Sequence, residues 1–294
     1  MKRIPLQVYL LFLLLISTSF IPERLDYSTA RFNNVCKDLS GDVLVYYIFI
    51  DSKTTTPWTE FDIVSTIDSI GVALNWIEKQ ALINGISLKI KSDYYIGKEF
   101  TTINRNLPNG SVEASLTMPN LRKGTSELNK WADYVSKKAG ESFFIAPKDG
   151  IPNSQTPKTT ERLIAHLRDE YNVESVALLF MVNNYYRNDI SFAFNTLTSD
   201  FVEYAIVSYK YPAEIAHNLF HLYGAPDLYK TPLRKSERKV KLAESLFQND
   251  IMQDPYSKNI NQLDIGDYTK YMLGWTNELD IKYVPLLTDR FQNI

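Results

Sequence analysis

The pattern of apolar and polar residues is most regular between residues 42 and 96. Residues 42–51 are β-branched or aromatic almost throughout, and an apolar run without alternation predicts a central strand covered on both faces. Residues 63–81 carry apolar side chains three or four positions apart, which predicts a helix. Residues 86–96 alternate at first, as a strand does. Strand, helix and strand in this order predict a βαβ unit.

The sequence marks both the beginning and the end of that helix. Thr59 precedes the apolar spacing and Asp62 follows three residues later, a pair that can cap the first turn reciprocally. Asn84-Gly85 stands where the spacing stops, and glycine adopts the left-handed conformation in which helices often end. We therefore expect the helix to run from just after Thr59 to Asn84.

The rest of the chain alternates between helical and strand-like patterns. Polar stretches at 97–122 and 147–158 predict loops. Helices are predicted at 126–139, 160–171 and 268–275, and strands at 143–145, 174–182, 191–194, 202–209 and 281–284. Together these elements predict an α/β (α+β) fold, with a twisted mixed sheet packed against helices in a single domain of residues 41–294.

The composition and charge indicate an ordinary globular protein. The chain has 294 residues, of which 45% are hydrophobic and 22% charged, as in an ordinary globular protein. Its net charge is −2. Basic residues are concentrated between 230 and 241, and a run of charged residues like this one usually forms a solvent-exposed face of the protein. We expect no nucleic-acid partner, because no basic stripe follows a face of the chain.

Residues 1–20 have the pattern of a secretory signal. Lys2 and Arg3 give a positive start, residues 8–16 form an apolar run too short to span a bilayer, and Ser17-Thr18-Ser19 offers a small-x-small cleavage site. Cleavage would remove the two positive charges and take the net charge from −2 to −4. We expect a secreted or periplasmic protein with no stable membrane span after cleavage; an uncleaved N-terminal anchor is the alternative.

Residues 21–40 are expected to form an extended lead-in to the domain, and they contain the only cysteine, Cys36. A single cysteine cannot form an internal disulfide. The simplest expectation is a small buried side chain. Since a thiolate is also a good zinc ligand, Cys36 could instead reach a metal if the lead-in covered a cleft.

The stretch from Glu214 to Tyr229 carries the candidate chemistry. His217 and His221 are four residues apart, so on a helix both imidazoles lie on one face and can reach one ion. Gly224 can end the helix, and Asp227 can then offer a carboxylate to the same ion. Two nitrogens and one oxygen leave a fourth position open, as in catalytic zinc sites.

This stretch resembles the metzincin clan of zinc peptidases, whose motif is HExxHxxGxx followed by His or Asp. The Asp form is that of the snapalysin-like secreted bacterial enzymes. Met252, within the segment Asn249-Asp250-Ile251-Met252-Gln253, is similar to the methionine turn that the clan carries beneath its metal. The resemblance implies a zinc ion held by His217, His221 and Asp227, and a peptide or protein bound in the cleft as an added strand.

One position departs from the clan's pattern. Asn218 stands where these enzymes have the glutamate that takes a proton from the zinc-bound water, and an amide cannot act as that base. Loss of a general base costs about 10²–10⁴ in rate. The sequence therefore predicts a zinc-binding protein with impaired peptidase activity. Two alternatives remain open, an active peptidase in which Glu214 substitutes as base, and a metal-free interaction protein on the same fold.

Overall fold

A computed structural model describes most of the chain from Cys36 to Thr288. The described residues are 36, 38–53, 55–97, 102–108, 110, 121–143, 157–183, 191–194, 203–208, 211–231, 236–256 and 258–288. The signal-like residues 1–20 and most of the lead-in lie outside them, as do positions 144–145 of one predicted strand. No helix among the described residues is both long enough and apolar enough to cross a bilayer.

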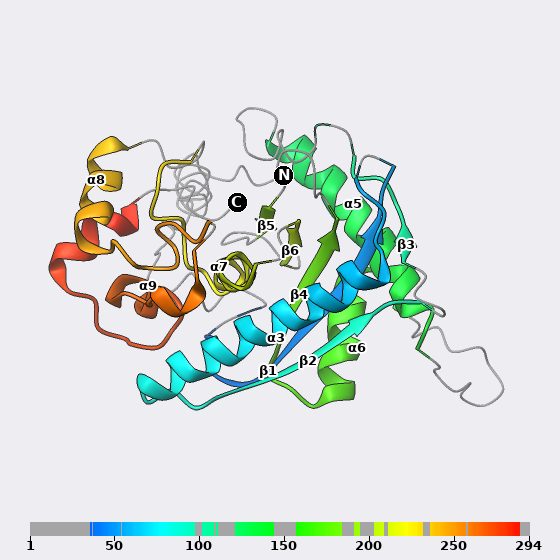
Figure 1. Ribbon diagram of the computed structural model, residues 1–294, viewed down its shortest axis with the longest axis horizontal. Coiled ribbons are helices and arrows are strands. Elements are labelled where there is room, and N and C mark those ends of the chain that lie inside the picture. The colour runs from blue at the N-terminus through cyan, green and yellow to red at the C-terminus, as the bar shows by residue number, and fades with distance from the viewer. Residues whose placement is uncertain are drawn as a thin grey trace, which may run out of the picture.

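Six strands among the described residues form a mostly parallel sheet at the centre of the molecule (Figure 1). Its main path runs in the order β2-β1-β4-β6-β5, with the short β3 also paired to β1. All pairs are parallel except β5 with β6, which is antiparallel. The strands are β1 (Gly41–Asp51), β2 (Leu88–Tyr95), β3 (Ile103–Asn104), β4 (Ser175–Val182), β5 (Ser191–Phe194) and β6 (Tyr204–Val207). The expectation of a mixed sheet packed with helices is confirmed.

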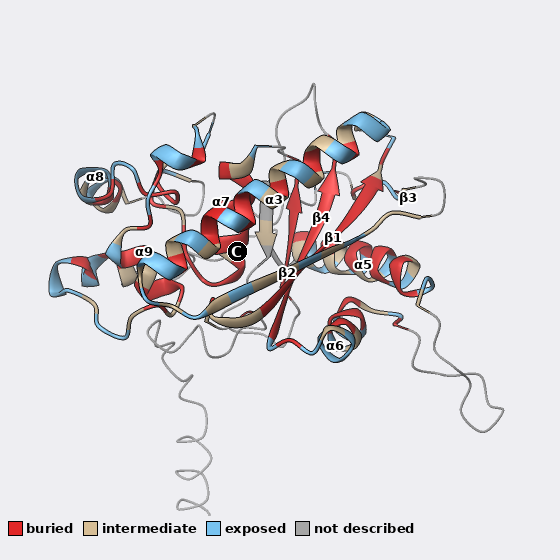
Figure 2. Ribbon diagram, turned by 60° about the horizontal axis from the view of Figure 1, so that its bottom comes forward, coloured by how far each residue is buried: buried red, intermediate tan, exposed pale blue. Residues whose placement is uncertain are grey.

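Strand β1 is buried on both faces, as its apolar run predicts. Val45 and Tyr47 belong to one apolar cluster and Tyr46 and Ile48 to the other, because successive side chains of a strand point to opposite faces. Helices α3 (Glu60–Ile83) and α7 (Pro212–Leu222) cover the first face, and α5 (Leu121–Gly140) and α6 (Thr160–Tyr171) cover the second (Figure 2). The sheet therefore separates two packed layers.

The predicted βαβ unit is present as β1, α3 and β2, with the two strands parallel. Thr59 caps α3: its side chain accepts a hydrogen bond from the backbone N–H of Asp62, and the Asp62 carboxylate accepts one from the N–H of Thr59. Asn84 ends the helix and Gly85 follows with a φ of 71°. Both boundaries match the signals in the sequence.

The C-terminal part was predicted less well. The strand expected at 281–284 is wrong: the segment belongs to a 3₁₀ helix, η5 (Ile281–Thr288). Its buried residues Tyr283 and Leu286 are three apart, which suits the 3₁₀ repeat and not the two-residue repeat of a strand. The basic stretch near residue 230 leads into a helix, α8 (Glu237–Leu246), that was not predicted.

Other boundaries differ in detail. Helix α5 begins at Leu121, inside the stretch expected to be a loop, and that same stretch also contains β3. The closing helix is shorter than expected, α9 (Asp267–Met272), and a short 3₁₀ turn, η4 (Ile260–Gln262), precedes it. Cys36 is fully buried, and its thiol donates to the carbonyl of Val176 at the start of β4, as expected for a small core residue.

Candidate metal centre

Helix α7 brings the two histidines together in the interior of the molecule. Figure 1 shows the helix between the sheet and the C-terminal segments that carry α8 and α9. Almost every residue of α7 is buried, including His217. The rings of His217 and His221 meet edge to face, with centroids 4.5 Å apart. The one-face arrangement expected from their four-residue spacing is therefore present.

The turn after α7 reverses the chain toward the same face. Gly224 has a φ of 90°, a conformation that disfavours any residue with a Cβ. The N–H of Gly224 bonds the carbonyl of His221, and the N–H of Ala225 bonds that of Phe220, which is the pattern of a Schellman cap. Gly224 therefore has the role expected for it, and the reversed chain carries Asp227 back beside the histidines.

Three potential ligand atoms converge at one point. The Nε2 atoms of His217 and His221 are 3.0 Å apart, and Oδ1 of Asp227 lies 3.1 Å from the first and 3.2 Å from the second. Among the described residues this is the one group of three or more His, Cys, Asp or Glu residues arranged so that it could hold a metal ion. Side-chain exposure rises from 4% at His217 to 16% at His221 and 24% at Asp227, so solvent reaches the group from the aspartate side.

Backbone carbonyls fix the orientation of both imidazoles. Nδ1 of His217 lies 3.0 Å from the carbonyl oxygen of Ile251, and Nδ1 of His221 lies 2.7 Å from that of Ala225. Since a carbonyl oxygen can only accept, each Nδ1 carries the proton. A neutral ring then has its lone pair on Nε2, directed at the other ligand atoms. A carbonyl partner of this kind is what metal-bound histidines usually have.

The charges in this group are strongly coupled. Burial lowers the pKa of His217, and the neighbouring His221 lowers it further. Burial alone would also lower the pKa of His221, but the carboxylate of Asp227 outweighs it and raises that pKa. Burial would raise the pKa of Asp227, yet the two imidazoles hold it well below its usual range. The metal-free group thus keeps an ionised carboxylate beside nitrogens that compete for a proton or a cation.

The segment that contains Met252 ties the helix and the aspartate loop together. The carbonyl of Ile251 holds His217, and the carbonyl of Met252 accepts from the N–H of Leu228, the residue after Asp227. Met252 itself is fully buried. The predicted turn therefore lies against the ligand group, although its carbonyls rather than its sulfur make these contacts.

Asp250 keeps that turn in shape. Its carboxylate accepts hydrogen bonds from the N–H of Met252, the N–H of Gly266 and the hydroxyl of Thr269, at 2.7, 2.7 and 2.8 Å. Burial raises the pKa of Asp250 to about 6, while these donors oppose the rise. The group is therefore mostly ionised at neutral pH, and the ionised form can accept all three bonds.

Asn218 is buried beside the ligands, but its amide is turned back onto its own helix. Nδ2 donates to the carbonyl of Glu214, four residues earlier, at 2.8 Å. Glu214 is also buried, at 2% exposure, and it does not belong to the ligand group. The position of the missing base is thus filled by a group bonded to the α7 backbone.

Two tyrosines near the site were not expected from the sequence. The ring of Tyr229 stacks on that of His217 with centroids 6.2 Å apart, and Tyr256 lies 6.5 Å from the same ring. Their hydroxyls are 3.1 Å apart. Burial and then the nearby Asp227 raise the pKa of Tyr229, so its phenol stays protonated at neutral pH. The position of Tyr229 two residues after Asp227 was the only signal that could have indicated it.

Comparison of the chain with protein-family models, curated proteins and solved structures finds no match in any of the three.

Proposed function

We propose that this chain is a secreted, zinc-binding, metzincin-like protein that binds a peptide or protein and cleaves it poorly or not at all. One observation carries the proposal: the three ligand atoms of His217, His221 and Asp227 converge within 3.2 Å of one another, while the Asn218 amide is bonded to the helix backbone. Two lone pairs and a carboxylate at such distances repel one another unless a cation or a proton lies between them. The ligand set fits zinc, which prefers imidazole nitrogen and carboxylate oxygen.

The chemistry of a bound zinc ion would be incomplete here. Zinc lowers the pKa of a bound water toward about 7 and polarises a carbonyl. Hydrolysis of an amide also needs a group that moves the proton to the leaving nitrogen, and Asn218 has no basic lone pair at neutral pH. A bound peptide would therefore remain largely uncleaved.

In this proposal, an extended segment of the bound peptide lies along strand β5. Strand β5 is the last strand on the path of the described sheet, pairs antiparallel with β6 and packs against α7. A strand with a free edge can accept a peptide through backbone hydrogen bonds. We assign this edge to the peptide in the proposal, which agrees with the strand addition that the metzincin resemblance implies.

Two substitutions at Asn218 test the proposal. Asn218→Glu cannot donate to the Glu214 carbonyl, so its carboxylate is released from the helix and should raise chelator-sensitive hydrolysis of an unstructured protein by about 10²–10⁴. Asn218→Gln has nearly the same size without a base and should show no gain. Efficient chelator-sensitive cleavage by the unchanged protein would contradict the proposal. A zinc-loaded Asn218→Glu variant without gain would contradict the idea that only the base is missing.

The second candidate is an active peptidase that uses Glu214 as its base. This candidate is favoured by the buried position of Glu214, one turn before Asn218. However, one helical turn separates the two residues by about 5.4 Å along the axis. If cleavage is observed, Glu214→Gln should abolish it under this alternative. An unchanged rate would remove Glu214 from consideration.

A further inference from the structure

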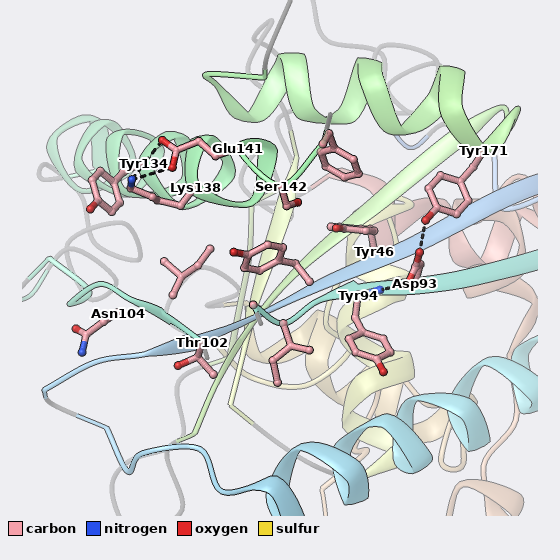
Figure 3. A pocket seen from close by; sticks show the side chains of 15 residues that line it. Tyr46, Asp93, Tyr94, Thr102, Asn104, Tyr134, Lys138, Glu141, Ser142 and Tyr171 are labelled. Atoms are coloured by element: carbon pink, nitrogen blue, oxygen red, sulfur yellow. Dashed lines mark hydrogen bonds and ion pairs between the residues drawn. The ribbon is translucent and has the colours of Figure 1, made fainter. Parts of the chain in front are cut away.

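A cavity lies on the face of the sheet opposite to α7. Its volume is about 810 Å³, which falls in the range of small-molecule binding pockets. Strands β1 and β2 form its floor, and α5, the end of α6 and the short β3 form its sides (Figure 3). Tyr46 contributes to it, whereas the next residue, Tyr47, belongs to the cluster on the α7 face. The cavity is therefore separate from the metal centre.

Aromatic rings dominate this cavity. Five of them belong to the α5 and α6 side of the sheet: Tyr46, Tyr95, Tyr134, Phe143 and Tyr171. Tyr134 is 37% exposed, and the guanidinium of Arg105 stacks on its ring at 4.2 Å from the centroid. Such rings offer flat apolar surfaces to a ligand at a small cost in side-chain entropy.

The charged groups among the rings are one ammonium and two carboxylates. The ammonium of Lys138 donates to both oxygens of Glu141, at 3.2 and 2.9 Å, and its third N–H is not used within that pair. The carboxylate of Asp93 accepts from the hydroxyl of Tyr171 and from the N–H of Tyr94, and an ionised carboxylate can accept further bonds. The cavity therefore offers both acceptors and donors, the latter including the hydroxyls of its lining, whereas its one ammonium is already paired with a carboxylate.

The hydroxyl of Tyr46 is the most informative of these groups. Tyr46 is only 3% exposed, its ring packs in the apolar cluster, and its hydroxyl makes no hydrogen bond to the described residues. Figure 3 shows this hydroxyl directed toward the space enclosed by the lining side chains. A hydroxyl on an otherwise buried side chain gains free energy when a ligand supplies its missing partner.

We propose that this cavity binds a neutral oligosaccharide. Sugar rings have apolar faces that stack on tyrosine and phenylalanine, and hydroxyls that both donate and accept, which matches Tyr46, Asp93 and Lys138. A purely apolar ligand would leave the Tyr46 hydroxyl without a hydrogen bond, and an anion would meet two carboxylates against one ammonium. The proposal is independent of the metal and of the proposed function.

Titration of the full mature protein with cellotriose, maltotriose and triacetylchitotriose tests the proposal. At least one of these neutral trisaccharides should bind at concentrations up to about 10 mM, measured by calorimetry. Tyr134→Ala should weaken that binding about tenfold, since an aromatic contact contributes about 1–1.5 kcal/mol. Tyr46→Phe should weaken it about threefold or more, yet leave the free energy of unfolding unchanged, because the hydroxyl has no hydrogen-bond partner among the described residues.

Phe61→Ala is the matched control, because Phe61 is an aromatic residue of α3, 81% exposed and outside the cavity. It should leave saccharide binding unchanged. The proposal is overturned if no trisaccharide binds, or if binding is the same in Tyr46→Phe and Tyr134→Ala as in the unchanged protein. It is also overturned if the cavity binds a proline-rich peptide, with the same dependence on both tyrosines, in place of the sugars.

Discussion

The chain has two parts of different architecture, and helix α7 lies between them. The part before α7 is a sheet with helices on both faces, held by large apolar side chains such as Phe180 and Trp131. The part after it consists of turns, short helices and 3₁₀ segments, in which buried apolar side chains such as Tyr268 and Leu273 are joined by side-chain to backbone bonds such as those of Asp250. The first part positions α7, whereas the second provides Asp227 and the carbonyl of Ile251.

Because of this difference, we expect substitutions in the two parts to affect global stability and metal binding separately. Damage to the sheet should unfold the molecule without changing how a folded molecule binds metal. Damage to the turns after α7 should change metal affinity more than it changes global stability. Substitutions in each part can therefore be compared in the same two assays, the free energy of unfolding and the zinc affinity.

The largest loss of stability is expected from the sheet core. Phe180 in β4 is fully buried and meets Trp131 and Tyr204 edge to face, with centroids 5.2 and 5.3 Å apart. Phe180→Ala should lower the free energy of unfolding by about 3–5 kcal/mol through lost burial and a cavity. Chemical denaturation measures this, and Phe61→Ala on the exposed face of α3 is the control, expected to change it by less than about 0.5 kcal/mol. A drop in zinc affinity of folded Phe180→Ala would break the proposed separation.

A smaller loss of stability with a clear loss of zinc affinity is expected at Asp250. Asp250→Asn places an amide donor among the N–H of Met252, the N–H of Gly266 and the hydroxyl of Thr269, which leaves at least one buried donor unpaired. The cost should be about 1–3 kcal/mol of unfolding free energy. Because Ile251 then holds His217 less firmly, zinc affinity should fall about 10–100-fold.

Asp280→Asn is the matched control for that variant, because Asp280 is exposed in the same part of the chain and the contacts described for its carboxylate are with Lys282 alone. It should change neither quantity. Equal zinc affinity in Asp250→Asn and the unchanged protein would show that the turn does not support the ligand group.

The smallest change in zinc affinity is expected from a change of pH by one unit. Asp227 raises the pKa of His221 in the metal-free group, so a proton competes with zinc for Nε2. Zinc affinity should therefore fall as pH is lowered through that pKa, by about tenfold per pH unit for each proton displaced. Competition with a chelator of known affinity between pH 7.5 and 5.5 (about two units) measures the slope. Asp227→Asn should bind zinc more weakly at every pH but with a shallower slope, and an equal slope would argue against this coupling.

The sequence predicted the first part well for a physical reason. The strand at β1, the capping box of Thr59 and Asp62, and the ends of α6 depend on local patterning, which can be read from neighbouring residues. Helix α8 and the 3₁₀ helix η5 depend on what they pack against, so short apolar runs such as residues 281–284 remained ambiguous.

The site could be predicted only in part. The spacing of His217, His221, Gly224 and Asp227 specified the ligand group because it lies within one helix and one turn. The groups that orient it were not predictable in this way. The carbonyl of Ile251 and the ring of Tyr256 come from positions 34 and 39 residues after His217, and a backbone carbonyl has no signature in the sequence.

The central claim is that His217, His221 and Asp227 form a working zinc site, and elemental analysis tests it most directly. Protein purified without chelators or a histidine tag should contain about one zinc per chain, as three protein ligands with an open position imply. His221→Ala, prepared in parallel, should contain almost none. A value near zero in the unchanged protein after zinc has been added, or equal zinc in both proteins, would contradict the account.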